Sequence, residues 1–404
     1  MTIPSPSPFP TASSGSSLLA REQLLAHDVR PILPALLPEK FLHWRRHEEA
    51  VLYVLHRVNL FTWLMGQDSA PLNARGLCGV LGKGYGHDLL HECVREDFLT
   101  TDFQFIPEVK SRHFALTDYT RSFPFRRVEA SEWLTRKIRQ QRDKNTLQLL
   151  RDSPVLEQLY LDLGRFYLAG DFQGTLAALV AANPSSAPFL QLQLERFLHR
   201  QWHFSRPSGA RVFHNITHLS RQLRRHLMVD GEKCSEADVC ACQPTLLAHY
   251  YAAPCPERTK LIEAIHADFY QFLLGAVAEL SGKVLTRGQV KHQFLVEMFG
   301  PDYQRKTVWA AMGREFPQLC AKIEEFRKPH YTCLAGRLQR LEASIVIDQV
   351  LPRIKQELGP VPLTTVHDCV VGPDDKIEAI AAILSRGFEE HLDFAPKLKI
   401  ERAA

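Results

Sequence analysis

Hydrophobic and polar residues recur along this chain with two periods, and the period changes from one segment to the next. Residues 18–70 follow the 3.6-residue period of a helix. One stripe of that helical pattern consists of Phe41, Trp44, His47, Val51 and Leu55. We take this stripe as the buried face of a packed helix. Residues 128–205 are also mostly helical in pattern.

Residues 77–119 show a different order of patterns. A glycine-rich turn, Gly82 to Gly86, precedes a short helical pattern at residues 89–94, and two extended runs follow at 99–106 and 111–116. A helix followed by a two-stranded hairpin is the order found in a winged helix. Such a hairpin would bring three basic side chains to DNA phosphates: Lys110, Arg112 and His113. A small α/β packing unit without DNA contact is the equally weighted alternative.

Two aspartates in the second half of the chain lie at the end of an apolar run or within one, where a charged side chain is unusual. Asp238 ends a polar-to-apolar run and is followed by a helical stretch at residues 245–251. His367 and Asp368 interrupt an apolar run at residues 362–372, which predicts a strand–turn–strand hairpin. A charged group in a buried hairpin is costly unless a partner compensates it. A metal ion held by both aspartates would be such a partner.

A helical pattern at residues 286–300 lies between the two aspartates. Side chains four residues apart share one face of a helix. On this face two cations are followed by an apolar residue, an aromatic ring and a glycine: Arg287, Lys291, Leu295, Phe299 and Gly300. Such a face suits a nucleoside triphosphate, because the cations can hold phosphates and the ring can pack on the base or sugar. A surface helix with a basic end is the alternative.

The order of these segments fits one reaction. Phosphoryl transfer to a 3′-hydroxyl needs metal ions bridged by carboxylates and cations on the triphosphate. Together the segments resemble motifs A, B and C of the family A DNA polymerases and the related phage-type single-subunit RNA polymerases. The resemblance covers residues 205–375, and its most specific element is the Arg-x3-Lys-x3-apolar-x3-aromatic-Gly helix.

The resemblance implies a role for each matching residue. Asp238 and Asp368 would hold two Mg²⁺ or Mn²⁺ ions with the help of the Val239 carbonyl, and Lys291 would act in catalysis. The nucleotide site would consist of Arg287, Lys291, Leu295, Phe299, Gly300 and Gln243. Template and primer contacts would come from Arg211, Arg221, Arg224, Gln339 and His367. A DNA template, a primer or product strand and nucleoside triphosphates would be the partners, with other replication proteins as further candidates.

Three departures from the family pattern bear on the choice of sugar. Gln243 stands where the DNA polymerases have a ribose-excluding Glu, and Cys369 stands where Glu follows the His-Asp pair. Phe299 replaces the usual Tyr. The missing acids resemble the RNA polymerases, so dNTP and rNTP use both stay open. No exonuclease pattern of spaced acids occurs in the first half.

Composition adds little to the prediction of function. The net charge of +4 permits nucleic-acid binding without requiring it. The basic run Arg136, Lys137 and Arg139 is either a phosphate-binding face or a solvated one. No apolar run reaches the roughly 20 residues of a membrane span, so we expect no membrane partner. Residues 1–17 are rich in Pro and Ser without a signal-peptide pattern, which indicates a disordered tail and a cytoplasmic location.

The nine cysteines favour reduced thiols over a disulfide framework. A zinc site is a minor alternative, built from four of Cys234, Cys240, Cys242, His249 and Cys255, although their spacing matches no standard finger. The motif A interpretation already accounts for this segment as a strand beside a metal site.

The fold class we expect is α+β: mostly helical, with a small antiparallel palm sheet, a right-hand core of palm and fingers, and an N-terminal winged-helix-like module. The expected divisions are a tail at 1–17, the N-terminal domain at 18–125, a helical thumb-like region at 126–205 and the polymerase core at 206–404. The expected function is a DNA-dependent nucleic-acid polymerase, foremost a small DNA polymerase. An RNA-synthesising primase or RNA polymerase of a plasmid or mobile element, and a non-catalytic DNA-binding replication protein, are the alternatives.

Overall fold

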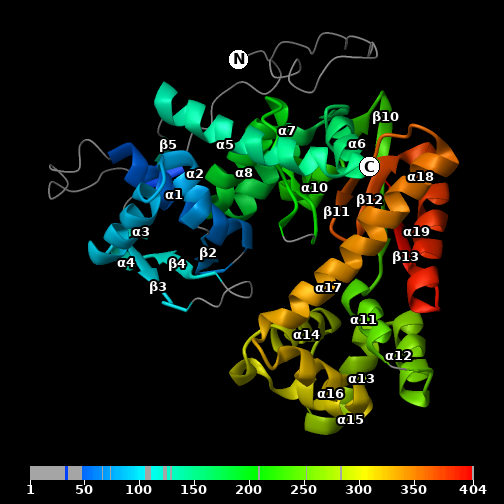
Figure 1. The fold of residues 1–404 in the computed structure, drawn as a ribbon. Coiled ribbons are helices and arrows are strands. Elements are labelled where there is room, and N and C mark those ends of the chain that lie inside the picture. Colours follow the sequence, from blue (N-terminus) through cyan, green and yellow to red (C-terminus); the bar gives the residue numbers. More distant parts are fainter. Residues whose placement is uncertain are drawn as a thin grey trace.

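The structure is a computed structural model, and it describes residues 32–34 and 48–402 apart from short gaps at 66, 73, 105–110, 122–124, 128–129, 208–209, 252 and 283. The predicted tail and the first part of the helical stripe, Phe41 to His47, lie outside the described residues. Figure 1 shows the N-terminal elements on one side, a layer of helices α5–α8 beside them, and the main sheet with α18 and α19 on the other side. A lobe of helices, α12–α16, lies below the sheet.

The N-terminal elements form a three-stranded antiparallel sheet packed against three helices. Its strand order is β2-β4-β3, so the last strand lies between the other two. The elements are α1 (Glu48–Met65), β2 (Ala70–Pro71), α2 (Ala74–Leu81), α3 (Tyr85–Arg95), β3 (Leu99–Thr101), β4 (His113–Leu116) and α4 (Asp118–Arg121). A separate strand pair joins β1 (Ile32–Pro34) to β5 (Phe125–Arg127). These elements have a hydrophobic core of their own, centred on Val54, Leu77, Leu89 and Phe114.

The glycine-rich turn between α2 and α3 is required for packing. Gly84 has a φ of 87°, which L-residues with side chains rarely adopt. A Cβ on Gly86 would lie 2.9 Å from the backbone of Leu77 and Cys78, so only glycine lets the two helices approach this closely. The predicted helix and the two extended runs are confirmed as α3, β3 and β4, although the first strand stops at Thr101.

Four longer helices and a short strand follow. They are α5 (Glu132–Arg151), α6 (Pro154–Leu163), β6 (Phe166–Leu168), α7 (Phe172–Ala182) and α8 (Ala187–Leu198). Ser131, Ser153 and Asp171 begin α5, α6 and α7 with side chains that accept hydrogen bonds from the first turn, as N-cap residues do. The mostly helical character predicted for this part of the chain is confirmed.

The main sheet has six antiparallel strands in the order β11-β12-β10-β9-β6, with β13 paired to the other edge of β10. The strands are β9 (Leu227–Val229), β10 (Glu232–Val239), β11 (Thr364–Val366), β12 (Cys369–Pro373) and β13 (Leu398–Glu401), together with β6. A two-stranded hairpin, β7 (Phe204–Ser205) with β8 (Phe213–His214), and two short helices, α9 (Asn215–His218) and α10 (Arg221–Arg224), lead into the sheet. Helix α19 (Ile377–Leu392) contacts β10, β12 and β13. The predicted antiparallel sheet and the hairpin at residues 362–372 are thus confirmed.

The lobe below the sheet is helical. It runs through α11 (Cys242–Leu247), α12 (Pro256–Ala267), α13 (Phe269–Ser281), α14 (Arg287–Phe299), α15 (Thr307–Glu315) and α16 (Pro317–Arg327). Helix α17 (Thr332–Ile345), a π-helical segment (Val346–Val350) and α18 (Leu351–Leu358) form one long rod that returns to the sheet (Figure 1). Aromatic rings such as Phe269, Phe294 and Phe316 fill the lobe.

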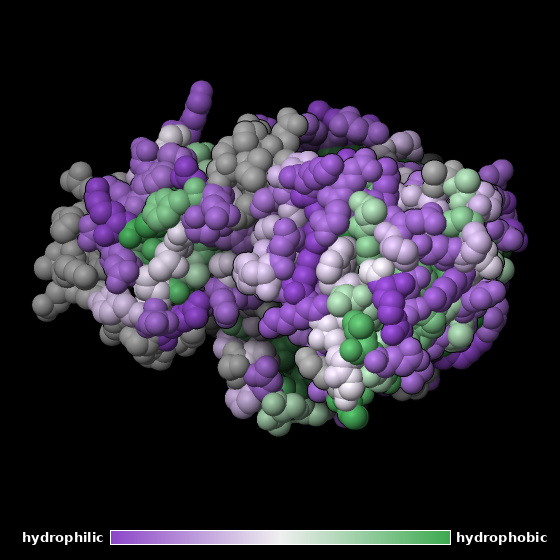
Figure 2. All heavy atoms as spheres, turned by 90° about the horizontal axis from the view of Figure 1, so that it is seen from below, coloured by the Kyte–Doolittle hydropathy of each residue, from purple (hydrophilic) through white to green (hydrophobic). Residues whose placement is uncertain are grey.

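The face of the molecule seen from below is mainly hydrophilic. Figure 2, seen from below, shows mostly hydrophilic side chains with scattered hydrophobic spots. Among the described residues no single helix is long and apolar enough to cross a membrane. Helices α12 and α13 reach that length only as a pair bent by 112°. Their apolar residues Leu261, Ile265 and Leu273 belong to the main core.

Candidate active site

The two predicted aspartates meet at one end of the main sheet. Asp238 is the seventh residue of β10 and lies opposite Cys369 of β12, so Asp368 stands one residue away in the turn that joins β11 to β12. Ala237 and Val239 point into the core on the other face of β10, with 0% and 2% of their surface exposed. The alternation of the strand therefore puts Asp238 and Glu236 on one face, toward α17 and the helical lobe.

Two residues beside the aspartates have unusual backbone angles. His367, the first turn residue, has a φ of 60°, and Ala241, which follows β10, has a φ of 51°. Two-residue hairpin turns need positive φ at this position, but glycine usually supplies it. A side chain held in the left-handed region costs about 1 kcal/mol or more, and such residues cluster at functional sites. The backbone strain therefore coincides with the two segments that carry the aspartates.

Both carboxylates are held in a setting that disfavours their charge. Burial, together with Asp368 and Glu236, raises the pKa of Asp238 to about 6, against the smaller opposing effects of Arg221 and Lys291. Burial and the nearby Glu342 raise the pKa of Asp368 to about 6. Within the part of the chain that the structure describes, neither aspartate forms an ion pair with an arginine or lysine. The two aspartates thus bring negative charge together without a described cation that pairs with either of them.

Two further acids border the aspartates, and each is paired with an arginine. Glu236 accepts a hydrogen bond of 2.9 Å from Arg224 Nε, and its other oxygen lies 3.9 Å from Cys369 Sγ. Glu342 of α17 is 1% exposed and accepts two bonds of 2.6 Å from Arg211. The nearby Arg224 and Arg211 are thus already bonded to the two glutamates. Asp238 and Asp368 are therefore left without a cationic partner among the described residues.

Carboxylates from other segments lie next to the two positions at which acids were missing from the sequence pattern. Gln243 Nε2 donates to Glu342 Oε2 at 3.2 Å, and Cys242 Sγ lies 3.8 Å from the same oxygen. Glu236, across the ladder, lies beside Cys369. A carboxylate therefore stands next to both Gln243 and Cys369, supplied in each case by another segment of the chain.

Helix α14 presents the predicted face outward. Arg287 and Lys291 are exposed, and Leu295 and Phe299 are half-buried, whereas Val290 and Phe294 on the opposite face are fully buried. Thr286 and Gln289 form a reciprocal capping box that fixes the start of the helix. A Cβ on Gly300 would come 2.5 Å from the Val296 carbonyl oxygen, so glycine is needed where the helix ends.

Tyr270, at the start of α13, connects this helix with the aspartates. The guanidinium of Arg287 and the ammonium of Lys291 lie 5.5 and 5.6 Å from the centre of its ring. Burial, with Cys242 and Asp368 as further contributors, raises the pKa of Tyr270 above its ordinary range. Arg287 also donates a hydrogen bond of 2.7 Å to Asp268, which caps α13. The lysine and the aspartates therefore face one space, since the Lys291 charge lowers the pKa of Asp238.

The predicted nucleic-acid residues fall into two groups. Arg211, Arg221, Arg224 and His367 surround the aspartates. Arg211 and Arg224 hold the buried acids described above, and Arg221 pairs with Glu401 of β13. Arg211 and Arg224 therefore organise the site in addition to any contact with a ligand. His367 packs edge-on against Phe213, and burial, with Arg211 and Arg224 nearby, lowers its pKa to about 4.

The remaining predicted residues lie on α17 and α5. Gln339 is half-buried on α17, about one turn before Glu342. Arg136 is exposed on α5, and Lys137 and Arg139 are half-buried on the same helix. Sequence reasoning missed Glu342, Glu236 and Tyr270. Glu342 lies three residues after the glutamine that the pattern singled out, which is the one signal that could have pointed to it.

The cysteines of the described residues are free thiols, and Cys234, Cys242 and Cys369 are buried. No group of three or more His, Cys, Asp or Glu side chains in the described ranges has the arrangement of a metal site. The two aspartates would therefore need backbone, water or substrate oxygens to complete the coordination of a cation.

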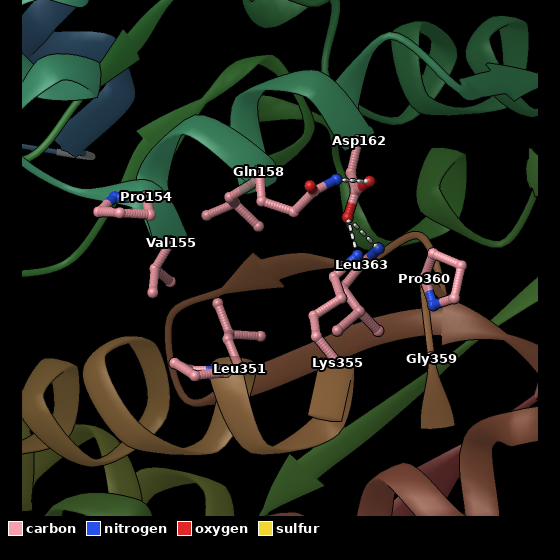
Figure 3. Close-up of a pocket in the computed structure, with 11 residues that line it drawn as sticks. Pro154, Val155, Gln158, Asp162, Leu351, Lys355, Gly359, Pro360 and Leu363 are labelled. Carbon is pink, nitrogen blue, oxygen red and sulfur yellow. Dashed lines mark hydrogen bonds and ion pairs between the residues drawn. The ribbon is translucent and has the colours of Figure 1, made fainter. Parts of the chain in front are cut away.

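A pocket of about 410 Å³ lies elsewhere, between α6 and α18 (Figure 3). Pro154, Val155, Leu159, Leu351 and Leu363 give it mostly apolar walls. Asp162, 1% exposed, closes one end with bonds from Lys355 Nζ at 2.5 Å, the Leu363 backbone NH at 3.0 Å and Gln158 at 3.0 Å. Lys355, the Leu363 NH and Gln158 thus all bond to Asp162. The cluster therefore joins α6, α18 and the residue directly before β11.

Comparisons with known proteins find similarity among solved structures. No family model matches the sequence, and no curated protein matches it. Among solved structures, the chain is similar to the POL domain of Pol1 from M. smegmatis, described in complex with a DNA primer-template and dNTP. The TM-score is 0.41 and the sequence identity is 15%, over 57% of this chain and 55% of that one. The similarity thus spans about half of each chain.

Proposed function

We propose that this chain is a template-directed nucleotidyltransferase that extends a nucleic-acid strand on a DNA template, foremost a small DNA polymerase. The observation that carries the proposal is the pair Asp238 and Asp368. Both are half-buried, burial and neighbouring acids raise the pKa of each, and neither has a cationic partner among the described side chains. Unpaired buried charge is expensive and concentrates at functional sites.

The donor set suits a hard divalent cation. Carboxylate and carbonyl oxygens are the ligands that Mg²⁺ and Mn²⁺ prefer. Asp238, Asp368 and the Val239 carbonyl would hold two such ions. When bound, the ions would activate the 3′-hydroxyl and neutralise the charge that develops on the transferred phosphoryl group.

The residues of α14 would bind the nucleotide. Lys291 and Arg287 are exposed beside Tyr270, with Lys291 directed toward the aspartates, where a triphosphate would reach both. Leu295 and Phe299 continue the same face and would pack on the base or sugar. Lys291 would also hold the charge of the leaving pyrophosphate or supply a proton to it.

The glutamates beside the aspartates would set the charge and shape of the sugar pocket. Glu342 holds Gln243 and Arg211, and Glu236 stands beside Cys369. Acids are thus present next to both positions that lack them in sequence. This arrangement leaves the choice of sugar open, and an RNA-synthesising primase is the alternative within the same chemistry.

The N-terminal elements support a second, compatible role in duplex DNA binding. The support for this role is their order α1-β2-α2-α3-β3-β4 with the sheet order β2-β4-β3, which is the order we expect of a winged-helix-like unit. Helix α3 exposes His87, His91 and Arg95 on one side. Of the three predicted hairpin residues, Lys110 lies outside the described residues, and Arg112 and His113 are half-buried. A DNA-binding replication protein without catalysis would use this unit alone.

The test offers primed and unprimed single-stranded DNA with Mg²⁺ or Mn²⁺ and supplies dNTPs and rNTPs in separate reactions. We expect template-dependent extension in at least one of the reactions and none with Asp238→Ala or Asp368→Ala. The sugar used and the need for a primer distinguish the polymerase from the primase. Extension that survives either substitution would remove the assignment, and DNA binding without extension in any reaction would favour the non-catalytic alternative.

A further inference from the structure

Two arginines lie where helix α1 of the N-terminal elements packs against helix α8 of the helical layer. We call this helix–helix contact the N-terminal seam. Leu60 and Trp63 of α1 pack there against Phe189 and Leu192 of α8, with the rings of Trp63 and Phe189 stacked at 4.9 Å. Arg57 lies one turn before Leu60 on α1, and Arg196 lies one turn after Leu192 on α8. The two arginines therefore border the same helix–helix contact.

Neither arginine has an acidic partner in the part of the chain that the structure describes. The Arg57 guanidinium lies 4.4 Å from the centre of the Phe61 ring. Burial first, and then Arg57, lower the pKa of Arg196 to about 10. Two cations held together in this way repel each other, and a bound anion would offset the free-energy cost of this repulsion.

Two histidines continue from Arg196 toward the sheet. His203 follows the end of α8, and its ring stacks on that of His218 in α9 at 5.8 Å. His203 is exposed to solvent, yet burial and then His218, Arg57 and Arg196 hold its pKa well below the ordinary value. These histidines are thus neutral at pH 7 and present hydrogen-bonding groups and ring faces.

The row reaches the hairpin that carries Asp368. His214, at the start of α9, bonds through Nε2 to Thr364 Oγ1 of β11 at 3.0 Å. Thr364 begins the strand that leads into the His367–Asp368 turn. Arg57, Arg196, His203 and His218, which we call the arginine–histidine track, therefore connect the N-terminal seam with the candidate active site.

We infer that the arginine–histidine track binds the phosphodiester backbone of a single nucleic-acid strand on its way to the β11–β12 hairpin. A row of two cations and two neutral donors fits a chain of phosphates better than one compact anion. Arginine is suited to this because its guanidinium can bond to two phosphate oxygens at once. The destination of the strand rests on the proposed function, whereas its binding does not.

The experiment measures binding of a fluorescein-labelled single-stranded DNA by fluorescence anisotropy over a range of NaCl, in EDTA and without nucleotides. Each phosphate contact contributes about 0.7 to the slope of log K against log [salt] for a single strand. We expect the Arg57→Gln/Arg196→Gln variant to lower the slope by about 1.4 and to weaken binding about tenfold at low salt. Arg196→Gln alone should give about half of that change in slope.

Two controls separate charge from folding. Arg57→Lys/Arg196→Lys should keep most of the slope, because the charges remain. Arg386→Gln removes an exposed arginine on α19, on the far side of the molecule in Figure 1, and should leave the slope at the wild-type value. An unchanged slope in both the double and the single glutamine variants would overturn the inference, as would an equal drop in Arg386→Gln.

The outcomes also distinguish this inference from the proposed function. Asp375→Asn, at an exposed aspartate outside both the track and the candidate active site, should bind the strand with the wild-type slope. A reduced slope in the glutamine variants of a protein that never extends a strand would retain the track and remove the polymerase. Extension by the wild type with no change of slope would remove the track alone.

Discussion

Two clusters of carboxylates in this molecule differ most in the partners that their charges have. Asp162, beside the pocket of Figure 3, receives Lys355 at 2.5 Å, a backbone NH and a glutamine, and Arg165 stands 3.7 Å away. Asp238 and Asp368 lie on the same sheet without an ion pair among the described residues, next to two further acids. Asp162 is fully buried, whereas Asp238 and Asp368 are half-buried, and the electrostatic balance of the two clusters is opposite.

The difference indicates what each cluster is for. A buried carboxylate with all of its partners joins segments and stabilises the fold, and removing a partner is costly. A buried carboxylate without partners makes the fold less stable, so its retention suggests a bound cation or substrate. Substitutions at the two clusters should therefore have opposite consequences, with activity lost at one and stability lost at the other.

The largest effect should come from removing one of the unpaired aspartates. We expect Asp238→Asn or Asp368→Asn to reduce strand extension about a thousandfold or more, because the carboxylate charge that holds a cation is lost. The melting temperature should not fall. Asp375→Asn, an exposed aspartate paired with Lys376, is the matched control and should keep full activity. A comparable loss of activity in the control, or a lowered melting temperature in the variants, would contradict the proposed difference in role between the two clusters.

The next effect concerns the paired cluster. Lys355→Met removes the ammonium from Asp162 while keeping an unbranched side chain of similar length. We expect the free energy of unfolding to fall by roughly 3 kcal/mol, since a buried charge loses its main partner. Urea denaturation measures the change, and Lys376→Met at an exposed pair should cost less than about 0.5 kcal/mol. Equal costs would mean that Asp162 contributes no more to stability than a surface pair.

Much of the active-site region could be predicted from sequence because its signals are local. The hairpin at His367–Asp368 follows from apolar runs on both sides of a polar pair, and the face of α14 follows from steps of four residues. The order of patterns at residues 77–119 likewise gave the helix and strands that the structure contains. Each of these depends on neighbours within about two helical turns.

What could not be predicted depends on contacts between distant segments. Glu342 meets Arg211 across 131 positions, and Glu236 meets Cys369 across 133. Nothing in the local pattern of either glutamate marks it, because only the register of β10 against β12 and the approach of α17 bring them to the site. The same holds for the arginine–histidine track, whose members come from α1, α8, α9 and the segment between the last two.

A smaller effect should follow from removing the cation that faces the aspartates. We expect Lys291→Ala to reduce extension by about 10- to 100-fold, with a higher KM for the nucleotide, because a charge-assisted contact to the triphosphate is lost. Lys322→Ala on α16, an exposed lysine paired with Glu325, is the matched control and should behave as wild type. If both variants lost activity equally, the face of α14 would have no special relation to the aspartates.

The smallest effect is a dependence of stability on pH that only the unpaired aspartates should show. Their pKa of about 6 in the folded protein lies above the ordinary value of about 3.9. The folded state therefore holds protons that the unfolded chain has released. The stability from these groups is complete below about pH 4 and is lost as the pH rises through 6.

The asparagine variants test this in the protein without divalent metal. At pH 7.5 Asp238→Asn or Asp368→Asn should raise the free energy of unfolding by roughly 1–2 kcal/mol, since a disfavoured charge is gone, and at pH 4 the gain should vanish. Added Mg²⁺ or Mn²⁺ should stabilise the wild type at pH 7.5 and have little effect on either variant. Urea denaturation at both pH values, with Asp375→Asn as the control, measures the difference. A gain that persists at pH 4 would show that the asparagines stabilise by packing, and the contrast with Asp162 would then not be one of charge.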